Sequence, residues 1–550
     1  MVEQVRPYWP ESLPTELRYL HGEQSLYDYL QEHANHRPDE IAYLFYGKEI
    51  TWGMLLNQVN RLAGYFQQKG IKQGDCIALF MQNCPQYIIS HYAILQLGGT
   101  VIPLNPMYKA DELAYFLKEA PIKGIILSDD CYLELEKAGI PENFYFVITT
   151  SYQDYLPDTP ALPICSELTL PKKRIEGADD FLAIILSSQP LEKQASIDLD
   201  KDIALMVFTS GTTGRPKGAQ LTYKNALFKT AAVAQANGIT QADRLMACAP
   251  LSHIAGMIMG VNIPIYAGVP CVLFLRFDPI ATVQAIERYQ ITTWYSIAPM
   301  NAAVLQIPNI EERNLSSLKH NMATSFGLQV TEELATKWKA VTKGCILYEG
   351  AYGLSETHTC DTFMPKENIK YGSCGIPIYE THMKIIDPVN GAEMPVGQSG
   401  EIIVKNPGVF QGYLNRPEAT SETLKDGWVY TGDIGYFDED GYLYFQGRVK
   451  EMIKCSGYSV FPEDVEVLLN NHSAIQQSAV IGVPDPIRGE TVKAFIVLQD
   501  SYKGKISEFD LISWSKEHMA AYKYPRYIEI IDRLPTTPSG KVLRKLLKEE

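Results

Sequence analysis

The sequence lacks any grouping of cysteines. Its ten cysteines are dispersed one at a time, without a C-x-x-C or another paired spacing. Structural zinc sites and disulfide frameworks of secreted proteins need grouped cysteines. We therefore expect free thiols in a reducing compartment and predict a cytoplasmic protein.

Long hydrophobic runs are also lacking. No stretch of 18 apolar residues occurs, and the longest candidate, 255–272, is interrupted by glycines, prolines and an asparagine. A membrane-spanning helix needs about 20 apolar residues, so we predict no transmembrane segment, while peripheral membrane contact stays open. Residues 1–14 are polar and contain three prolines, unlike a signal or transit peptide.

An excess of positive charge is missing as well. The chain has 64 acidic against 49 basic residues and a net charge of −15. Nucleic-acid-binding surfaces are basic, so we predict no nucleic-acid partner. A polyanionic ligand would have to be held by local Lys and Arg side chains.

The length of 550 residues is too great for one hydrophobic core and predicts at least two domains. Apolar periodicity predicts helices over 25–34, 52–68 and 85–97 and strands over 76–80, 100–104 and 345–348, an α/β alternation. Shorter units follow at 462–470, 478–483, 491–498 and 507–518. We predict an α/β and α+β protein, with a large multi-sheet N-terminal domain (1–448) and a small mobile C-terminal α+β domain (449–550).

The loop over 209–218 concentrates hydroxyls, glycines and cations. Such a composition is typical of phosphate binding, because glycines admit backbone N–H groups to an anion and Lys217 adds positive charge. A Walker A loop would place Lys after Gly and before a helix, whereas Lys217 follows Arg215-Pro216 and apolar strands flank the loop. We therefore predict a strand–loop–strand phosphate loop, with a ligand-free turn as the alternative. The predicted ATP-binding residues in it are Thr209, Ser210, Gly211, Thr212, Thr213, Gly214 and Lys217.

The segment 352–356 places an aromatic ring, a flexible glycine, a hydroxyl and a carboxylate within five residues. The ring of Tyr352 could stack on a base, and Glu356 could hold Mg²⁺, which favours carboxylate and phosphate oxygen. Gly353 and Ser355 complete the candidate site. Taken alone, the segment is equally compatible with a turn that carries an exposed Glu.

Two further segments have the residue types of a nucleotide site. Asp433 follows Thr431-Gly432, and a carboxylate in this setting can accept both hydrogens of a ribose diol. Arg448 and Lys541 belong to two cationic loops, and Lys541 follows Pro538-Ser539-Gly540 on a turn. Read separately, the Asp would be a turn residue and Lys541 a solvated surface lysine.

Together and in this order, these segments resemble the adenylate-forming superfamily of acyl-CoA synthetases, peptide-synthetase adenylation domains and beetle luciferases. The resemblance extends over essentially the whole chain. It implies ATP, Mg²⁺ and CoA as cofactor and co-substrates, and Thr209 would join Glu356 as a Mg²⁺ ligand. Tyr352 would stack on adenine, Asp433 and Arg448 would bind the ribose, and Lys541 would be the adenylation lysine.

The resemblance also implies a moving small domain and an acyl pocket. Lys450 falls at the hinge, and rotation would present Lys454 and Gly457 to CoA. His253 resembles the gate of the acyl pocket, although a lone His in an apolar stretch is more often a core residue. We further assign Gly256, Met257, Gly260 and Gly327 to the pocket, with close helix packing as the alternative for the glycines at 256 and 260. The segment 325–330 departs from the family's S-G-G-A-x-L, and Ser355 replaces the commoner Thr.

The implied activity is ATP-dependent conversion of a carboxylic acid to acyl-AMP, followed by transfer to CoA, with His253, Glu356 and Lys541 as catalytic residues. We expect a fatty acid of medium or long chain, with an aryl or branched acid as the alternative. An amino acid is disfavoured because 252–255 lacks the F-D-x-S pattern, and free CoA is expected because no carrier domain follows. A luciferase-like oxygenase and a non-catalytic nucleotide-binding protein are the alternatives of other classes. The oligomeric state, monomer or homodimer, stays open.

Overall fold

The computed structural model describes residues 8–548 except for 210–215, 327, 449–450, 456–457, 486–487, 520 and 538–540. The predicted helices are present as α1 (Leu26–His36), α2 (Trp52–Gln68) and α3 (Pro85–Gln96). Ser25 and Thr51 act as N-caps of the first two, because each side-chain oxygen accepts a hydrogen bond from a backbone N–H of the first turn.

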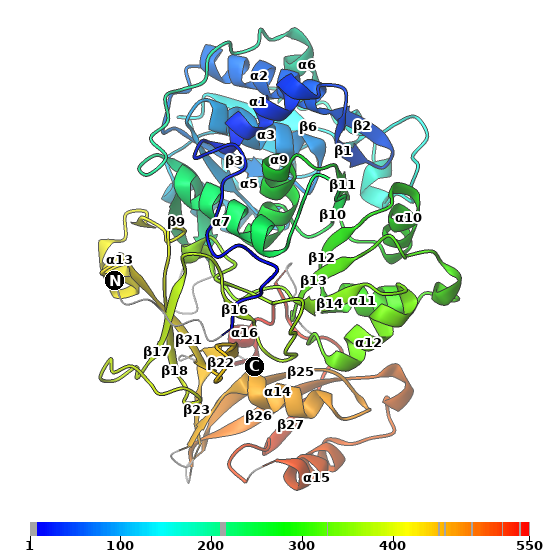
Figure 1. Ribbon diagram of the computed structural model, residues 1–550, viewed down its shortest axis with the longest axis vertical. Helices are drawn as coiled ribbons and strands as arrows, with labels where there is room; N and C mark the ends of the chain where they lie inside the picture. Colours follow the sequence, from blue (N-terminus) through cyan, green and yellow to red (C-terminus); the bar gives the residue numbers. More distant parts are fainter. Residues whose placement is uncertain are drawn as a thin grey trace.

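A large, mainly parallel sheet forms the end of the molecule that is coloured blue to cyan (Figure 1). Its central strands β3 (Cys76–Phe80) and β4 (Thr100–Pro103) are buried along their whole length, which explains their largely apolar sequence. In spatial order the strands are β19 (Gly412–Tyr413), β9 (Lys217–Thr222), β8 (Ile203–Thr209), β4 (Thr100–Pro103), β3 (Cys76–Phe80), β5 (Ile122–Ser128), β6 (Phe146–Thr150) and β7 (Asp179–Asp180).

A second, seven-stranded sheet lies beside it. Its order is β14 (Ile346–Glu349), β13 (His320–Thr324), β12 (Thr293–Ile297), β10 (Leu245–Ala247), β11 (Cys271–Leu273), β1 (Ile41–Phe45) and β2 (Lys48–Thr51). The helices of this N-terminal part also include α4 (Ala110–Glu119), α5 (Tyr132–Ala138), α6 (Phe181–Ser187), α7 (Tyr223–Ala236), α10 (Pro279–Tyr289), α11 (Ala298–Leu305) and α12 (Glu332–Val341).

The later part of the chain forms mainly antiparallel sheets, in which β26 and β27 are a parallel pair. One contains β17 (His382–Ile386), β18 (Gly400–Lys405), β21 (Trp428–Phe437), β20 (Leu424–Lys425) and β22 (Leu443–Arg448), with α13 (Pro417–Thr423) nearby, and β15 (Thr362–Phe363) pairs with β16 (Ile376–Pro377). The last sheet contains β24 (Tyr458–Val460), β23 (Ile453–Cys455), β26 (Gly489–Leu498), β25 (Ile475–Asp485) and β27 (Tyr527–Ile530), accompanied by α14 (Pro462–Asn470), α15 (Glu508–His518) and α16 (Arg544–Lys548).

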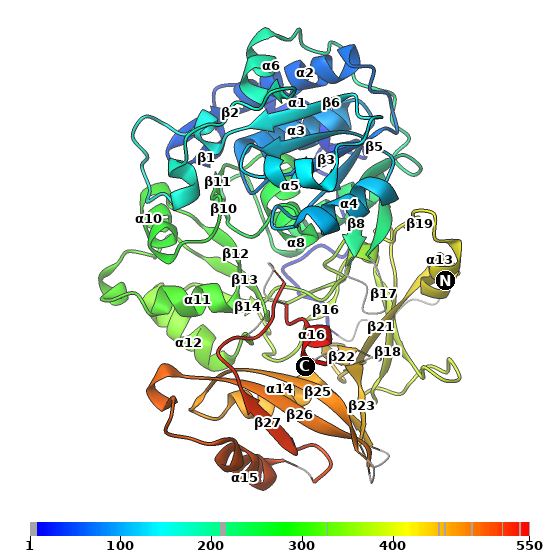
Figure 2. The same cartoon turned by 180° about the vertical axis from the view of Figure 1, so that it is seen from behind.

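Separate hydrophobic cores lie on the two sides of residue 448. The largest buried cluster runs from Leu26 to Tyr442, and another runs from Ile453 to Ile528. The C-terminal elements gather at one end of the molecule in both views (Figures 1 and 2). The predicted mixed α/β and α+β class is therefore confirmed, while the domain limits 1–448 and 449–550 stay a prediction.

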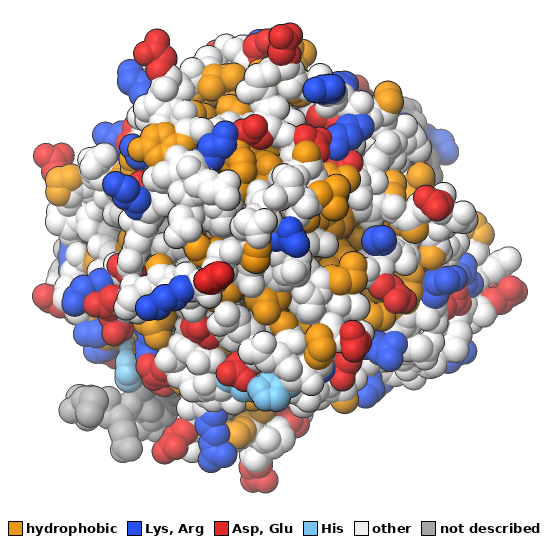
Figure 3. All heavy atoms as spheres, turned by 90° about the horizontal axis from the view of Figure 1, so that it is seen from above, with side chains coloured by type: hydrophobic (Ala, Val, Ile, Leu, Met, Phe, Trp, Pro, Cys, Tyr) orange, Lys and Arg blue, Asp and Glu red, His pale blue; other side chains and the backbone are white. Residues whose placement is uncertain are grey.

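Charges of both signs are mixed on the molecular surface. Figure 3 shows basic, acidic and apolar side chains interspersed over the face seen from above. Among the described residues, none of the helices combines the length and apolar character that crossing a bilayer requires. All ten cysteines are free thiols.

Candidate active site

One cavity of about 1750 Å³ brings together residues from distant parts of the chain. Its walls come from the two large sheets, from the β21–β22 hairpin and from the C-terminal segment that includes Lys541 and Arg544. The predicted site residues that line it are Thr209, Lys217, His253, Tyr352, Gly353, Ser355, Glu356, Asp433, Arg448 and Lys541.

Other predicted residues do not lie on the described wall. Gly256, Met257 and Gly260 are absent from the lining. The side chain of Lys454 is not described, although its backbone belongs to β23. Ser210, Gly211, Thr212, Thr213, Gly214, Gly327, Lys450 and Gly457 lie outside the described residues.

The predicted strand–loop–strand arrangement is present as the antiparallel hairpin β8–β9. Thr209 ends the first strand opposite Lys217, which begins the second. The chain leaves β9 directly into α7, because the side chain of Thr222 caps that helix by accepting a hydrogen bond from the backbone N–H of Asn225. The helix therefore begins at Tyr223.

The β8–β9 hairpin carries the predicted phosphate loop, and we call it the phosphate hairpin. Tyr413 joins it to the segment that contains Glu356. Its hydroxyl donates to Glu356 Oε1 at 2.6 Å, and Lys217 Nζ lies 4.2 Å from its ring centroid. The backbone N–H of Phe410 also donates to the carbonyl of Glu356 at 2.8 Å. Sequence reasoning missed Tyr413, because nothing in the residues around it marks a contact with positions 57 and 196 residues away.

Asp433, Arg448 and Tyr352 form a second polar group on the cavity wall. Asp433 is 3% exposed, and its Oδ1 lies 2.7 Å from Arg448 Nε. The Tyr352 hydroxyl donates to Asp433 Oδ2 at 2.7 Å. Burial raises the pKa of Asp433, and the charge of Arg448 opposes that shift. The neighbouring strands β21 and β22 set this geometry, since Asp433 and Arg448 are directly opposite in their register.

Lys541 lies in the same cavity, and its backbone is hydrogen-bonded to Thr537. The N–H of Lys541 donates to Thr537 Oγ1 at 3.0 Å, and the N–H of Thr537 donates to the Lys541 carbonyl at 2.7 Å. Burial and the charges of Arg448 and Arg544 lower the pKa of Lys541, while Glu451 and Asp433 oppose the shift.

His253 is the N-cap of a helical segment and also lines the cavity. Burial, together with the charge of Lys541, lowers the pKa of His253 to about 4. The imidazole is therefore neutral near pH 7. The C-terminal lysine and the predicted pocket gate are thus close enough to influence each other electrostatically.

Arg544 anchors the turn that carries Lys541. Its guanidinium lies 2.7 Å from Glu451, 2.9 Å from Glu463 and 2.8 Å from Glu466. Burial and the neighbouring carboxylates raise the pKa of Glu463 to about 7, against the opposing charge of Arg544. The cluster links the start of α16 to Glu451 and to α14.

The segment 254–267 is helical, and its two glycines face protein. It consists of α8 (Ile254–Met257), a π-helical turn (Ile258–Asn262) and α9 (Ile263–Ala267). A Cβ at Gly256 would lie 2.1 Å from the Pro250 carbonyl oxygen, and one at Gly260 would lie 2.6 Å from Leu251 Cδ2. These contacts agree with the alternative that Gly256 and Gly260 allow close packing. Met259, in the same segment, lines the cavity.

Residues 30–414 match the family described as AMP-binding enzyme, and residues 464–541 match its C-terminal domain. The chain belongs to the AMP-binding enzyme family. The first match covers well over half of the chain. Together with the CoA ligases among its relatives, it identifies an AMP-forming acyl-CoA synthetase.

Named relatives agree along the full length. A long-chain-fatty-acid–CoA ligase from Bacillus subtilis (strain 168) is 36% identical and covers 98% of this chain and 97% of its own. A feruloyl-CoA synthase from Amycolatopsis sp is 32% identical over 93% of this chain and 96% of its own. The solved structure of the anthranilate CoA ligase AuaEII with anthranoyl-AMP is 26% identical, covers 98% of both chains and has a TM-score of 0.84.

Enzymes of this class use ATP, Mg²⁺ and CoA. The oxygen donors of Thr209 and Glu356 both lie on the cavity wall. No group of three or more His, Cys, Asp or Glu side chains in the described part of the chain forms a cage for a metal. A single carboxylate and a hydroxyl fit Mg²⁺ that shares its coordination with phosphate oxygens.

Proposed function

We propose that this acyl-CoA synthetase activates a fatty acid of medium or long chain. The observation that carries the adenylation part is the convergence of Lys541, Glu356 and Asp433 on one cavity. The fatty-acid part is supported by the ligase from Bacillus subtilis and by apolar wall residues, among them Val233, Met259 and Met322.

The proposed roles follow from charge and position. Attack of the substrate carboxylate on the α-phosphate of ATP forms acyl-AMP and releases pyrophosphate. Lys541 would stabilise negative charge on the phosphate oxygens during this step, and Lys217 would do so from the hairpin. The neutral His253 would line the path of the acid. A Mg²⁺ ion held by Thr209 and Glu356 would neutralise phosphate charge.

The nucleoside would be held by Asp433, Arg448 and Tyr352. Asp433 and Arg448 would take the ribose hydroxyls, and Tyr352 would lie against the adenine. The Tyr352 hydroxyl already donates to Asp433 Oδ2, and Arg448 forms an ion pair with Asp433 Oδ1, which is buried without a hydrogen-bond partner among the described residues. The carboxylate is therefore oriented before a ligand arrives, which reduces the entropic cost of binding.

We further propose that the described orientation of the small domain serves adenylation, since Lys541 lies in the cavity. The CoA step would follow rotation about Lys450, bringing Lys454 and Gly457 to the thioester site. Because Lys541 and the 454–457 segment are separate parts of one small domain, rotation can exchange them at the same place.

An aryl acid is the second candidate, and the feruloyl-CoA synthase at 32% identity favours it. The oxygenase and the non-catalytic binding protein receive no support from the named relatives, which are CoA ligases. We propose a cytoplasmic location on the basis of the ten free thiols. The oligomeric state, monomer or homodimer, is to be tested by sedimentation. Peripheral membrane contact is to be tested by vesicle binding.

Pyrophosphate release with a panel of acids, with and without CoA, tests the proposed substrate. Saturated acids of increasing length should be preferred over benzoate and ferulate. Preference for ferulate would assign the aryl alternative, and light output in the same assay would identify an oxygenase.

A further inference from the structure

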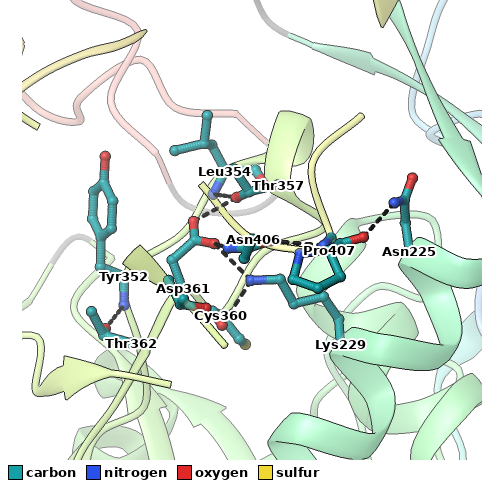
Figure 4. A network of polar contacts seen from close by, with 12 residues as sticks. Asn225, Lys229, Tyr352, Leu354, Thr357, Cys360, Asp361, Thr362, Asn406 and Pro407 are labelled. Carbon is teal, nitrogen blue, oxygen red and sulfur yellow. Dashed lines mark hydrogen bonds and ion pairs between the residues drawn. The ribbon is translucent and has the colours of Figure 1, made fainter. Parts of the chain in front are cut away.

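A fully buried ion pair contacts the segment that carries Tyr352 and Glu356. Lys229 Nζ is 2.6 Å from Asp361 Oδ1, and both side chains are 0% exposed. Asp361 also accepts hydrogen bonds from Thr357 Oγ1 at 2.5 Å and Asn406 Nδ2 at 2.8 Å. Lys229 donates in addition to the Cys360 carbonyl at 3.1 Å. Figure 4 shows these groups converging. Charges without water are tolerated only with such full pairing.

The pair joins two parts of the nucleotide site. Lys229 belongs to α7, which follows β9 of the phosphate hairpin without an intervening loop. Asp361 ends a segment, 352–361, that carries Tyr352 and Glu356. The N–H of Asp361 donates to the Tyr352 carbonyl at 2.7 Å, so the segment closes on itself as a loop. We call residues 352–361 the acidic loop.

The acidic loop has an unfavourable backbone. His358, Thr359 and Cys360 are three successive residues with φ values of 58°, 58° and 50°. Each non-glycine residue in this left-handed region is strained, and such strain persists only when surrounding contacts over-determine it. The hydrogen bond from Lys229 ends on the carbonyl of Cys360, the last residue of this turn. The ion pair therefore acts where the backbone needs support.

The side chain inside the turn adds no support of its own. His358 is 0% exposed, and neither ring nitrogen has a hydrogen-bond partner among the described residues. Opposite the turn, a Cβ at Gly353 would lie 2.3 Å from the backbone nitrogen of Cys360. The two ends of the acidic loop thus approach at backbone distance, and a shift of the turn is transmitted to Tyr352 and Glu356.

We propose that Lys229 and Asp361 are positioning residues of adenylation: the buried pair holds the left-handed turn and thereby sets Tyr352 and Glu356 against the phosphate hairpin. This inference rests on the nucleotide-binding roles proposed above for those two side chains. Neither Lys229 nor Asp361 lines the cavity, so both act through the acidic loop.

Three variants separate positioning from folding. Lys229→Met leaves a buried carboxylate without its cation and should lower Tm. In the double variant Lys229→Met/Asp361→Leu both charges are replaced by apolar groups of similar size. This removes the unpaired charge and should restore part of the lost Tm, although Asn406 Nδ2 and the Cys360 carbonyl lose their partners. Thr357→Val removes a hydrogen bond to Asp361 while keeping the ion pair. Leu62→Ala, fully buried on α2 and away from the cavity, serves as the destabilised control.

The readouts are KM for ATP, KM for the acid, AMP affinity by calorimetry without metal, and hydrogen exchange of 352–361. In the double variant we expect KM for ATP to rise and kcat/KM for ATP to fall by roughly ten- to a hundredfold, because small misplacements of binding groups cost that much. AMP should bind more weakly, exchange in the acidic loop should quicken, and KM for the acid should not change. Thr357→Val should show the same pattern in weaker form, and Leu62→Ala should change neither KM.

The proposal would be overturned if the double variant had the wild-type KM for ATP and the wild-type affinity for AMP. The ion pair would then have a purely structural role. If the double variant does not fold, Thr357→Val decides by the same criteria. Glu356→Ala and Tyr352→Ala are measured alongside. Normal ATP kinetics in Glu356→Ala and Tyr352→Ala would refute the proposed nucleotide site itself. Impaired ATP kinetics in these two variants, together with normal ATP kinetics in the Lys229 and Asp361 variants, would refute only the positioning role.

Discussion

At the residue scale, the proposed adenylation step depends on a lysine whose charge is needed in a partly dehydrated place. Lys541 shares the cavity with His253, Asp433, Arg448 and Glu356. Burial and two nearby guanidinium groups favour its neutral form, so its pKa lies below the ordinary value. A cation in this setting interacts with phosphate oxygens more strongly than a solvated lysine does.

The lowered pKa predicts an alkaline limb in the adenylation rate. In the proposed mechanism the protonated form of Lys541 stabilises phosphate charge, so activity should fall as pH rises through a pKa below that of a free lysine. Lys541→Arg keeps its charge at every accessible pH and should give a lower but flat alkaline profile. Pyrophosphate-release rates from pH 7 to 10 check this. An identical alkaline fall in both proteins would assign the ionisation to another group.

Single residues were predictable where a motif carries the chemistry. Tyr352, Glu356, Asp433 and Lys541 were selected from sequence, and all four line the cavity. Tyr413, Arg544, Lys229 and Asp361 were not selected, because their partners are remote in sequence and only tertiary packing brings them together.

At the element scale, periodicity and caps predict most segments closely. The helix over 52–68 and the strand over 76–80 appear with the predicted bounds. What periodicity does not supply is the direction in which a buried element faces. The segment 254–267 is apolar on all sides, so sequence alone could not decide whether Gly260 or Met259 faces the cavity.

Gly260→Leu and Met259→Trp test the orientation of that segment. A side chain at 260 would collide with Leu251 and Ala247, at a cost of about 1–3 kcal/mol in unfolding free energy. We expect a lower Tm and an equal loss for all acids. Met259→Trp should instead reduce kcat/KM for long acids and spare short ones, because it narrows the cavity. Chain-length profiles of both variants decide, and the reverse pattern would place Gly260 on the pocket wall.

At the scale of the whole molecule, the active site is assembled between two separately packed bodies. The cores on either side of residue 448 share no buried cluster within the described residues. Arg544, three residues after Lys541, forms an ion pair with Glu451, which directly follows the proposed hinge at Lys450. A rotation at that point would move Lys541 and its supporting carboxylates as one unit.

Lys450→Pro tests the two-orientation mechanism. Proline restricts φ at the proposed hinge and should hold the small domain in one orientation. One half-reaction should be lost while the other is largely kept, as measured separately by acyl-AMP formation and by thioester formation from supplied acyl-AMP. Lys450→Ala is the matched control without a backbone restriction. Unchanged kinetics of both steps in the proline variant would contradict a hinge at this residue.

The central claim is that Lys541 serves the adenylation step alone, and Lys541→Ala measures it most directly. Acyl-AMP formation should fall by roughly two orders of magnitude or more, the loss typical of removing one preorganised charge donor. Thioester formation from supplied acyl-AMP and CoA should stay near the wild-type rate. An equal fall in both half-reactions would contradict the account.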